Sequence, residues 1–147
     1  KWAEKEKVKK NSRTTTPTIG NGDSNSTERG MLIRERYCLE GAMIGRARIG
    51  KTWLVNQVEH FLQTGENHPA VSITERISAA RKHLEMSIDW KGERLGVFET
   101  RRHYTNYFKG IQDFKPFRQK LVTSDHSVDV FATLDDIYEK FYSYEFV

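Results

Sequence analysis

Two short glycine-containing segments carry residue types that can hold a phosphate group. They are Gly20-Asn21-Gly22-Asp23 and Gly45-Arg46-Ala47, and each follows a short apolar run. Glycines leave their backbone N–H groups unobstructed, and an arginine guanidinium adds charge-assisted hydrogen bonds. If both apolar runs are parallel strands, their carboxyl ends lie where α/β sheets bind ligands. The candidate phosphate ligands are Asn21, Gly22, Asp23, Gly45 and Arg46, although turn glycines and a surface arginine would explain the same pattern.

A second candidate site is the basic stretch from residue 101 to residue 120. It contains six Lys or Arg residues and one acidic residue, interleaved with Tyr and Phe. Basic side chains can contact nucleic-acid phosphates, and exposed aromatic rings can stack on unpaired bases. Helical spacing favours core packing for Tyr104 and Phe108, and exposure for Arg102 and Lys109. The candidate RNA-binding residues are Arg101, Arg102, Lys109, Lys115, Arg118 and Lys120.

The charge is distributed unevenly along the 147 residues, whose net charge is +4. Residues 1–75 carry a net +3, residues 76–120 a net +6 and residues 121–147 a net −5. A basic block followed by an acidic tail predicts one face for a polyanion and another that avoids it. An ordinary charged helical surface with a compensating acidic helix is the alternative interpretation.

Several classes of protein are excluded or disfavoured by composition. No run approaches the ~18 apolar residues of a membrane-spanning helix, and the charged amino terminus has no secretory signal. The single cysteine, Cys38, cannot form an internal disulfide, which fits a reducing cytoplasm, and we expect it to pack as a small hydrophobe. His83 and His103 have no companions at metal-ligand spacing, so we assign no metal site.

The elements that must position these residues change character between residues 50 and 70. Runs at 15–19 and 41–45 predict two buried strands around a helix that ends near Tyr37, as in a parallel βαβ unit. From there the pattern is helical only, with helices expected at 51–63, 73–90, 93–109, around 114–121 and at 127–141. Ser72 and Glu75 form a capping-box pattern, and Gly65 is a helix-ending residue. In the last helix we expect an inward stripe of Val128, Phe131, Leu134, Ile137 and Phe141.

Three segments, taken together and in this order, resemble the tRNA-dihydrouridine synthase family. They are IGNGD at 19–23, GAMIGRA at 41–47 with Gly50 and Trp53 after it, and ETRRHYTNYFKGIQDFKPFRQKLV at 99–122. The resemblance extends from about residue 8 to residue 142. It implies a fold in which residues 1–65 are the last βα units of an FMN-binding TIM barrel, an α/β fragment. Residues 66–147 would then be an all-α helical domain that binds tRNA.

The resemblance also implies a reaction and its cofactors. Members of the family reduce uridine to dihydrouridine in tRNA, with FMN as cofactor and NADPH as its reductant. Asn21, Gly22 and Asp23 match the first FMN-phosphate loop of the family, and Gly45 and Arg46 match the second. The catalytic cysteine of the family belongs to the earlier barrel strands. We therefore expect the chain to begin inside a larger cytoplasmic enzyme, monomeric in its full-length form, and to show little turnover alone.

Two other interpretations stay open at this point. The chain could be a non-enzymatic RNA-binding helical module with a vestigial βαβ segment. It could also come from a different FMN-phosphate barrel, although a generic barrel has no use for the basic helical segment at 99–122.

Overall fold

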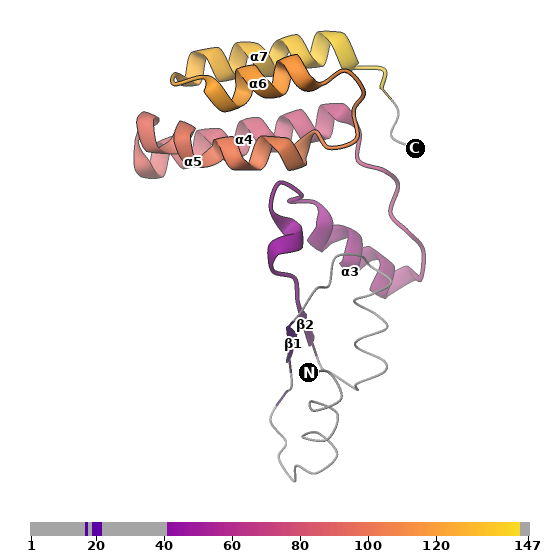
Figure 1. Ribbon diagram of the computed structural model, residues 1–147. Helices are drawn as coiled ribbons and strands as arrows, with labels where there is room; N and C mark the ends of the chain where they lie inside the picture. Colours follow the sequence, from indigo (N-terminus) through magenta and orange to yellow (C-terminus); the bar gives the residue numbers. More distant parts are fainter. Residues whose placement is uncertain (1–16, 18, 22–40, 145–147) are drawn as a thin grey trace. The chain divides into compact units, whose positions relative to one another are not determined.

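The computed structural model describes Pro17, Ile19–Asn21 and residues 41–144, and the chain divides into two compact units (Figure 1). The first unit runs to Ile49 and includes Trp53–His68, and the second consists of Gly50–Thr52 and the chain from Pro69 onward. The assignment of residues 1–65 to a barrel and of residues 66–147 to a tRNA-binding domain stays a prediction.

The first unit contains a parallel pair of short strands. Strand β1 (Ile19–Asn21) pairs with β2 (Gly41–Met43), so that Gly20 lies opposite Ala42. We expected the first strand to stop before Gly20, and this was wrong, because the pairing with β2 continues through Gly20 and Asn21. The helix expected to end near Tyr37 and the expected packing of Cys38 lie outside the described residues. Two paired strands do not by themselves establish the α/β barrel part, which stays a prediction.

A short 3₁₀ turn and one α-helix complete the described part of the first unit. The turn spans Arg46–Arg48, and helix α3 spans Leu54–Thr64. Helix α3 begins later than the predicted residue 51, because Gly50 has a left-handed backbone with a φ of 65° and a turn follows at 52–53. It ends where expected, at Gly65, which adopts φ 77°.

The second unit is all-helical, as the sequence predicts. Helices α4 (Ile73–Lys91), α5 (Glu93–Tyr107), α6 (Lys115–Thr123) and α7 (Ser127–Phe141) pack so that each contacts the next and α7 returns to α4 (Figure 1). Buried side chains from all four helices form one core, which includes Ile73, Ile77, Leu84, Val97, Tyr104, Leu121, Val130, Leu134 and Ile137. Within the described residues, no helix is long and apolar enough to span a bilayer.

Helix α4 begins at the predicted capping box. The Ser72 hydroxyl accepts from the Glu75 backbone N–H at 3.3 Å, and the Glu75 carboxylate accepts from the Ser72 N–H at 2.9 Å. Both bonds satisfy amide groups that the first helical turn leaves unpaired. The helix therefore starts at a fixed residue, and from that start the helical repeat determines which of its side chains face the core.

Helices α4 and α5 approach closely at Gly96. A Cβ at this position would lie 2.8 Å from the Ile88 backbone nitrogen and 2.9 Å from the Ser87 carbonyl carbon. The Thr100 hydroxyl donates to the Gly96 carbonyl at 2.7 Å, and the connection between the two helices is the single residue Gly92, with φ 79°. Backbone therefore packs against backbone, and only glycine fits at the crossing.

Helix α7 confirms most of its predicted inward stripe. Leu134, Ile137 and Phe141 are buried and Phe131 is half-buried, but Val128 is 73% exposed. The prediction for Val128 was wrong because the buried stripe starts at Val130, and two residues correspond to roughly 200° around a helix. Val128 therefore points away from the core.

The amino terminus of α7 receives its cap from another helix. The Ser127 backbone N–H and hydroxyl donate to the Glu93 carboxylate at 3.1 and 2.7 Å. These two hydrogen bonds lower the pKa of Glu93 from its usual value. The first residue of α5 thereby fixes the start of α7.

We predict that Gly96→Ala lowers the free energy of unfolding by about 1–3 kcal/mol, the range for overpacked sites. The new methyl group would force α4 and α5 apart, although alanine is the better helix former. Urea denaturation followed by circular dichroism measures the change. Thr105→Ala, at an exposed position of the same helix, is the control and should change stability by less than about 0.5 kcal/mol. Equal stability of the two variants would contradict a tight crossing.

Candidate functional site

The two strand ends that carry the candidate phosphate ligands lie next to each other. Because β1 and β2 are parallel, with Asn21 opposite Met43, their carboxyl ends meet at one edge. Gly22 and Asp23, which follow Asn21, lie outside the described residues. The structure therefore brings Asn21 and the Gly45–Arg46 segment to neighbouring strand ends, as a phosphate site requires.

Gly45 and Arg46 form the start of the 3₁₀ turn. Both are exposed, and among the described residues other than its chain neighbours, none has a heavy atom within 4 Å of the position that a Cβ of Gly45 would occupy. The Gly45 carbonyl accepts from the Arg48 N–H at 3.2 Å, which orients the backbone of the turn. Open space beside the backbone and an exposed arginine fit a phosphate group.

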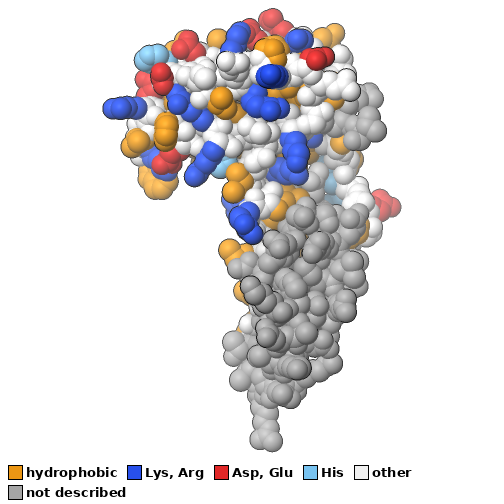
Figure 2. Space-filling view, in the orientation of Figure 1, with side chains coloured by type: hydrophobic (Ala, Val, Ile, Leu, Met, Phe, Trp, Pro, Cys, Tyr) orange, Lys and Arg blue, Asp and Glu red, His pale blue; other side chains and the backbone are white. Residues whose placement is uncertain are grey.

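The second candidate site is a group of cations on α5, α6 and the turn between them. We call Arg102, Lys109, Lys115 and Arg118 the basic surface, and all four are exposed. Among the described residues, none of the four forms an ion pair with an acidic side chain. Figure 2 shows Lys and Arg side chains spread over this helical unit, while α7 carries Asp129, Asp135, Asp136 and Glu139. The basic block and acidic tail of the sequence therefore correspond to different helices.

The other two predicted RNA-binding residues are engaged within the unit. Arg101 donates to the Ser124 carbonyl and to the Asp125 carboxylate, each at 2.6 Å, and its side chain is only 20% exposed. Lys120 lies 3.5 Å from the Asp136 carboxylate on α7. RNA contact by Arg101 and Lys120 stays a prediction, but both cations already have carboxylate partners.

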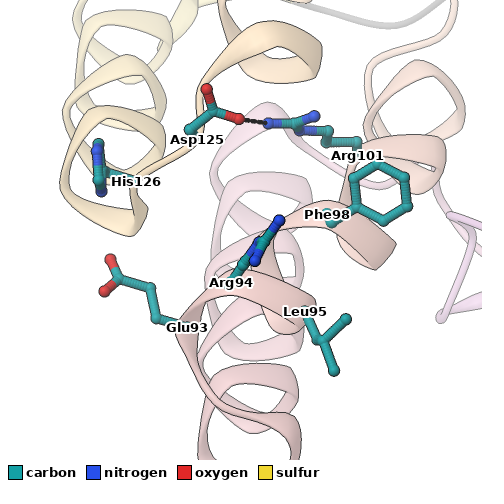
Figure 3. A pocket seen from close by; sticks show the side chains of 7 residues that line it. All are labelled: Glu93, Arg94, Leu95, Phe98, Arg101, Asp125 and His126. Carbon is teal, nitrogen blue, oxygen red and sulfur yellow. Dashed lines mark hydrogen bonds and ion pairs between the residues drawn. The ribbon is translucent and has the colours of Figure 1, made fainter.

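An open pocket of about 1020 Å³ lies beside Arg101, where the start of α5 meets the α6–α7 connection (Figure 3). The Arg101 guanidinium lies 5.5 Å from the ring centroid of Phe98, a cation–π distance, and Phe98 itself is 64% exposed. The pocket thus combines exposed apolar side chains with cations. It is lined by Glu93, Arg94, Leu95, Phe98, Arg101, Asp125 and His126.

Two histidine rings, one from α4 and one from α5, meet edge to face. The rings of His83 and His103 lie 4.7 Å apart, His83 Nδ1 is 3.1 Å from the Tyr107 hydroxyl, and Arg102 Nε donates to His103 Nε2 at 3.3 Å. Burial lowers the pKa of both histidines, and the Arg102 charge lowers each further, so both are neutral at pH 7. Among the described residues, no group of three His, Cys, Asp or Glu side chains is arranged to hold a metal ion.

Sequence reasoning missed four exposed large apolar side chains on α4 and α5. Met86, Trp90, Leu95 and Phe98 are 62%, 81%, 55% and 64% exposed. For α4 the sequence did contain a sign of this exposure. Met86 and Trp90 do not fit the helical spacing of the apolar stripe, which consists of Ile73, Ile77, Ala80 and Leu84. In the basic stretch, Tyr104 and Phe108 are core residues, as expected, Tyr107 and Phe114 are buried too, and Phe117 is half-buried.

Two adjacent strand ends with a glycine nearby are followed along the chain by a helical unit that carries an exposed basic surface. The chain belongs to the dihydrouridine synthase (Dus) family, whose model matches residues 1–142. It is 35% identical over 102 residues to a probable tRNA-dihydrouridine synthase of Rickettsia bellii, covering 69% of this chain and 31% of the relative.

Two further relatives show the same coverage. A probable tRNA-dihydrouridine synthase 1 of Synechocystis is 36% identical over 107 residues, covering 73% of this chain and 30% of the relative. A tRNA-dihydrouridine synthase B of Pseudomonas aeruginosa is 32% identical over 102 residues, covering 69% and 31%. The chain thus spans about a third of the length of these curated relatives. The family resemblance predicted from the sequence is confirmed, and the match agrees with a carboxy-terminal portion of the family.

We predict that stability falls as the pH is lowered from 7.5 to 5. The histidine pKa is about 6.5 in the unfolded chain and lower in the folded one, so the unfolded state binds more protons. The stabilisation is complete above the unfolded pKa and is lost as the pH falls through the folded values. Urea denaturation at each pH should show this slope, and His83→Gln combined with His103→Gln should flatten it. Ser87→Ala, which leaves both histidines in place, is the control and should keep the slope.

Proposed function

We propose that this chain is the carboxy-terminal portion of an FMN-dependent tRNA-dihydrouridine synthase. Membership of the dihydrouridine synthase family supports the class. The observation that carries the proposal is the basic surface, where Arg102, Lys109, Lys115 and Arg118 are exposed without acidic partners among the described residues. Exposed, unpaired cations on one unit suit the phosphate backbone of tRNA.

In the proposed enzyme, the first unit holds FMN by its phosphate. Asn21, Gly22 and Asp23 form one loop, and Gly45 and Arg46 form the other at the neighbouring strand end. The bound FMN, reduced by NADPH, supplies the hydride chemistry that converts uridine to dihydrouridine. This chain contributes binding rather than a catalytic residue, so we expect little turnover from residues 1–147 alone.

The helical unit holds tRNA by phosphate contacts that do not depend on the base sequence. Each lysine or arginine that neutralises a phosphate releases a condensed counterion, so binding weakens as salt increases. Arg101 and Lys120 support this surface through their ion pairs, which tie α5 to the α6–α7 connection and α6 to α7. The acidic side chains of α7 disfavour a phosphate backbone on that helix.

A second candidate function is a non-enzymatic RNA-binding helical module. One observation favours it: the four helices of the second unit bury a core of their own, with Leu84, Tyr104, Leu121, Leu134 and Ile137 all fully enclosed. FMN binding separates the two functions. A protein that includes the residues preceding Lys1 should bind FMN if the chain belongs to an enzyme, and should not if it is a binding module.

We predict that Lys115→Glu weakens binding of the 147-residue chain to tRNA at every salt concentration and reduces the slope of log K against log salt by about 1. Fluorescence anisotropy with labelled tRNA measures both quantities. Lys82→Glu makes the same charge change at an exposed position of α4 outside the basic surface, and it should have a smaller effect. If the two variants weaken tRNA binding equally, net charge rather than the basic surface controls affinity.

We predict that Arg46→Ala weakens FMN binding about tenfold or more in a protein that includes the residues preceding Lys1. A hydrogen bond to a charged partner contributes roughly 1.5–3 kcal/mol, and the exposed arginine is placed to make one. Flavin absorbance after gel filtration and fluorescence titration measure the affinity without requiring activity. Arg48→Ala, in the same 3₁₀ turn, is the matched control and should retain FMN. Equal FMN loss from both variants would argue against the assignment of Arg46.

A further inference from the structure

A groove runs between α4 and α5 on the helical unit, separate from the pocket at the α6–α7 connection. Its volume is about 360 Å³. Helix α4 contributes His83, Met86 and Trp90, and helix α5 contributes Glu99, Arg102 and His103. The close crossing at Gly96 brings these outward-facing side chains of the two helices beside each other.

The groove presents apolar and aromatic surface to solvent. Trp90 is 81% exposed and Met86 is 62% exposed, which is unusual for side chains of this size. The rings of His83 and His103, which meet edge to face, contribute uncharged aromatic surface at neutral pH. An isolated exposed methionine needs no explanation, but an exposed indole within a groove is a ready stacking platform.

Among the described residues, the charges around the groove leave one cation at its rim without an ion pair to an acidic side chain. Lys91 pairs with the Glu99 carboxylate, so the acidic group of the groove is neutralised. The Lys91 ammonium also lies 4.7 Å from the ring centroid of Trp90. Arg102 is exposed and, among the described residues, forms no ion pair with an acidic side chain. An anionic ligand with a flat ring complements this arrangement.

We propose that this groove binds an unpaired nucleotide of the RNA, whose base stacks on Trp90 and whose phosphate contacts Arg102. The inference rests on the proposed function, because it assumes that the helical unit binds RNA. It adds a preference for RNA with unpaired bases to the phosphate contacts of the basic surface. Arg102 belongs both to the basic surface and to the groove. An RNA strand held by its phosphates at α5 therefore has a base within reach of the groove.

The test uses the 147-residue chain and two labelled RNAs with equal numbers of phosphates, a hairpin with an unpaired loop and a blunt duplex. Trp90→Ala should weaken binding to the hairpin about tenfold, within the range for loss of one stacked base, and should leave duplex binding nearly unchanged. Trp90→Phe keeps an aromatic ring, so its affinity for the hairpin should lie between those of the unsubstituted chain and Trp90→Ala. Phe98→Ala removes an exposed aromatic ring from the other pocket and should affect neither RNA.

Thermal unfolding of each variant verifies that the fold is intact, which the exposure of Trp90 leads us to expect. The inference is overturned if Trp90→Ala weakens both RNAs equally, or affects the hairpin no more than Phe98→Ala does. It is also overturned if sedimentation shows that Trp90→Ala disrupts an association between chains while RNA binding is unchanged. If Lys115→Glu weakens both RNAs and Trp90→Ala weakens neither, only this inference fails. If the unsubstituted chain binds neither RNA, the proposed function fails with it.

Discussion

The contact on which the helical unit depends is the meeting of two backbones at Gly96. With no side chain between them, α4 and α5 approach closely enough for the Ser87 hydroxyl of α4 to donate to the Gly96 carbonyl of α5. This crossing fixes which side chains of α4 and α5 are enclosed with α6 and α7, and it places the outward-facing His83, Trp90 and Arg102 along a common groove.

Local sequence patterns predicted the elements of this unit well. The capping box at Ser72 and Glu75 depends on two residues three positions apart, and helical periodicity depends on neighbours within a few turns. For the same reason the exposure of Arg102 and Lys109 and the burial of Tyr104 were predictable. The error at Val128 has the same origin, because an apolar residue at the first turn can fit a stripe by spacing and still lie beyond the core.

The candidate site was only partly accessible from the sequence, because partners distant along the chain decide what each charge does. Arg101 and Arg102 are adjacent and chemically identical, yet one is held by Asp125 and the other is exposed. No spacing rule predicts that Ser124 and Asp125 meet α5. Likewise, the neighbouring positions of Asn21 and Met43 follow from strand pairing, which the sequence indicates only if both runs are assumed to be parallel strands.

The carboxylate of Glu93 that caps α7 has a consequence for the order in which the unit folds. Helices α4 and α5 are joined by Gly92 alone, so their contacts close short loops and cost little chain entropy. Helix α7 lacks a side-chain cap at His126 and takes its acceptor from a residue 34 positions earlier. We therefore expect the α4–α5 hairpin to act as the template on which α7 assembles, so that folding proceeds from the amino-terminal hairpin of the unit toward its acidic last helix.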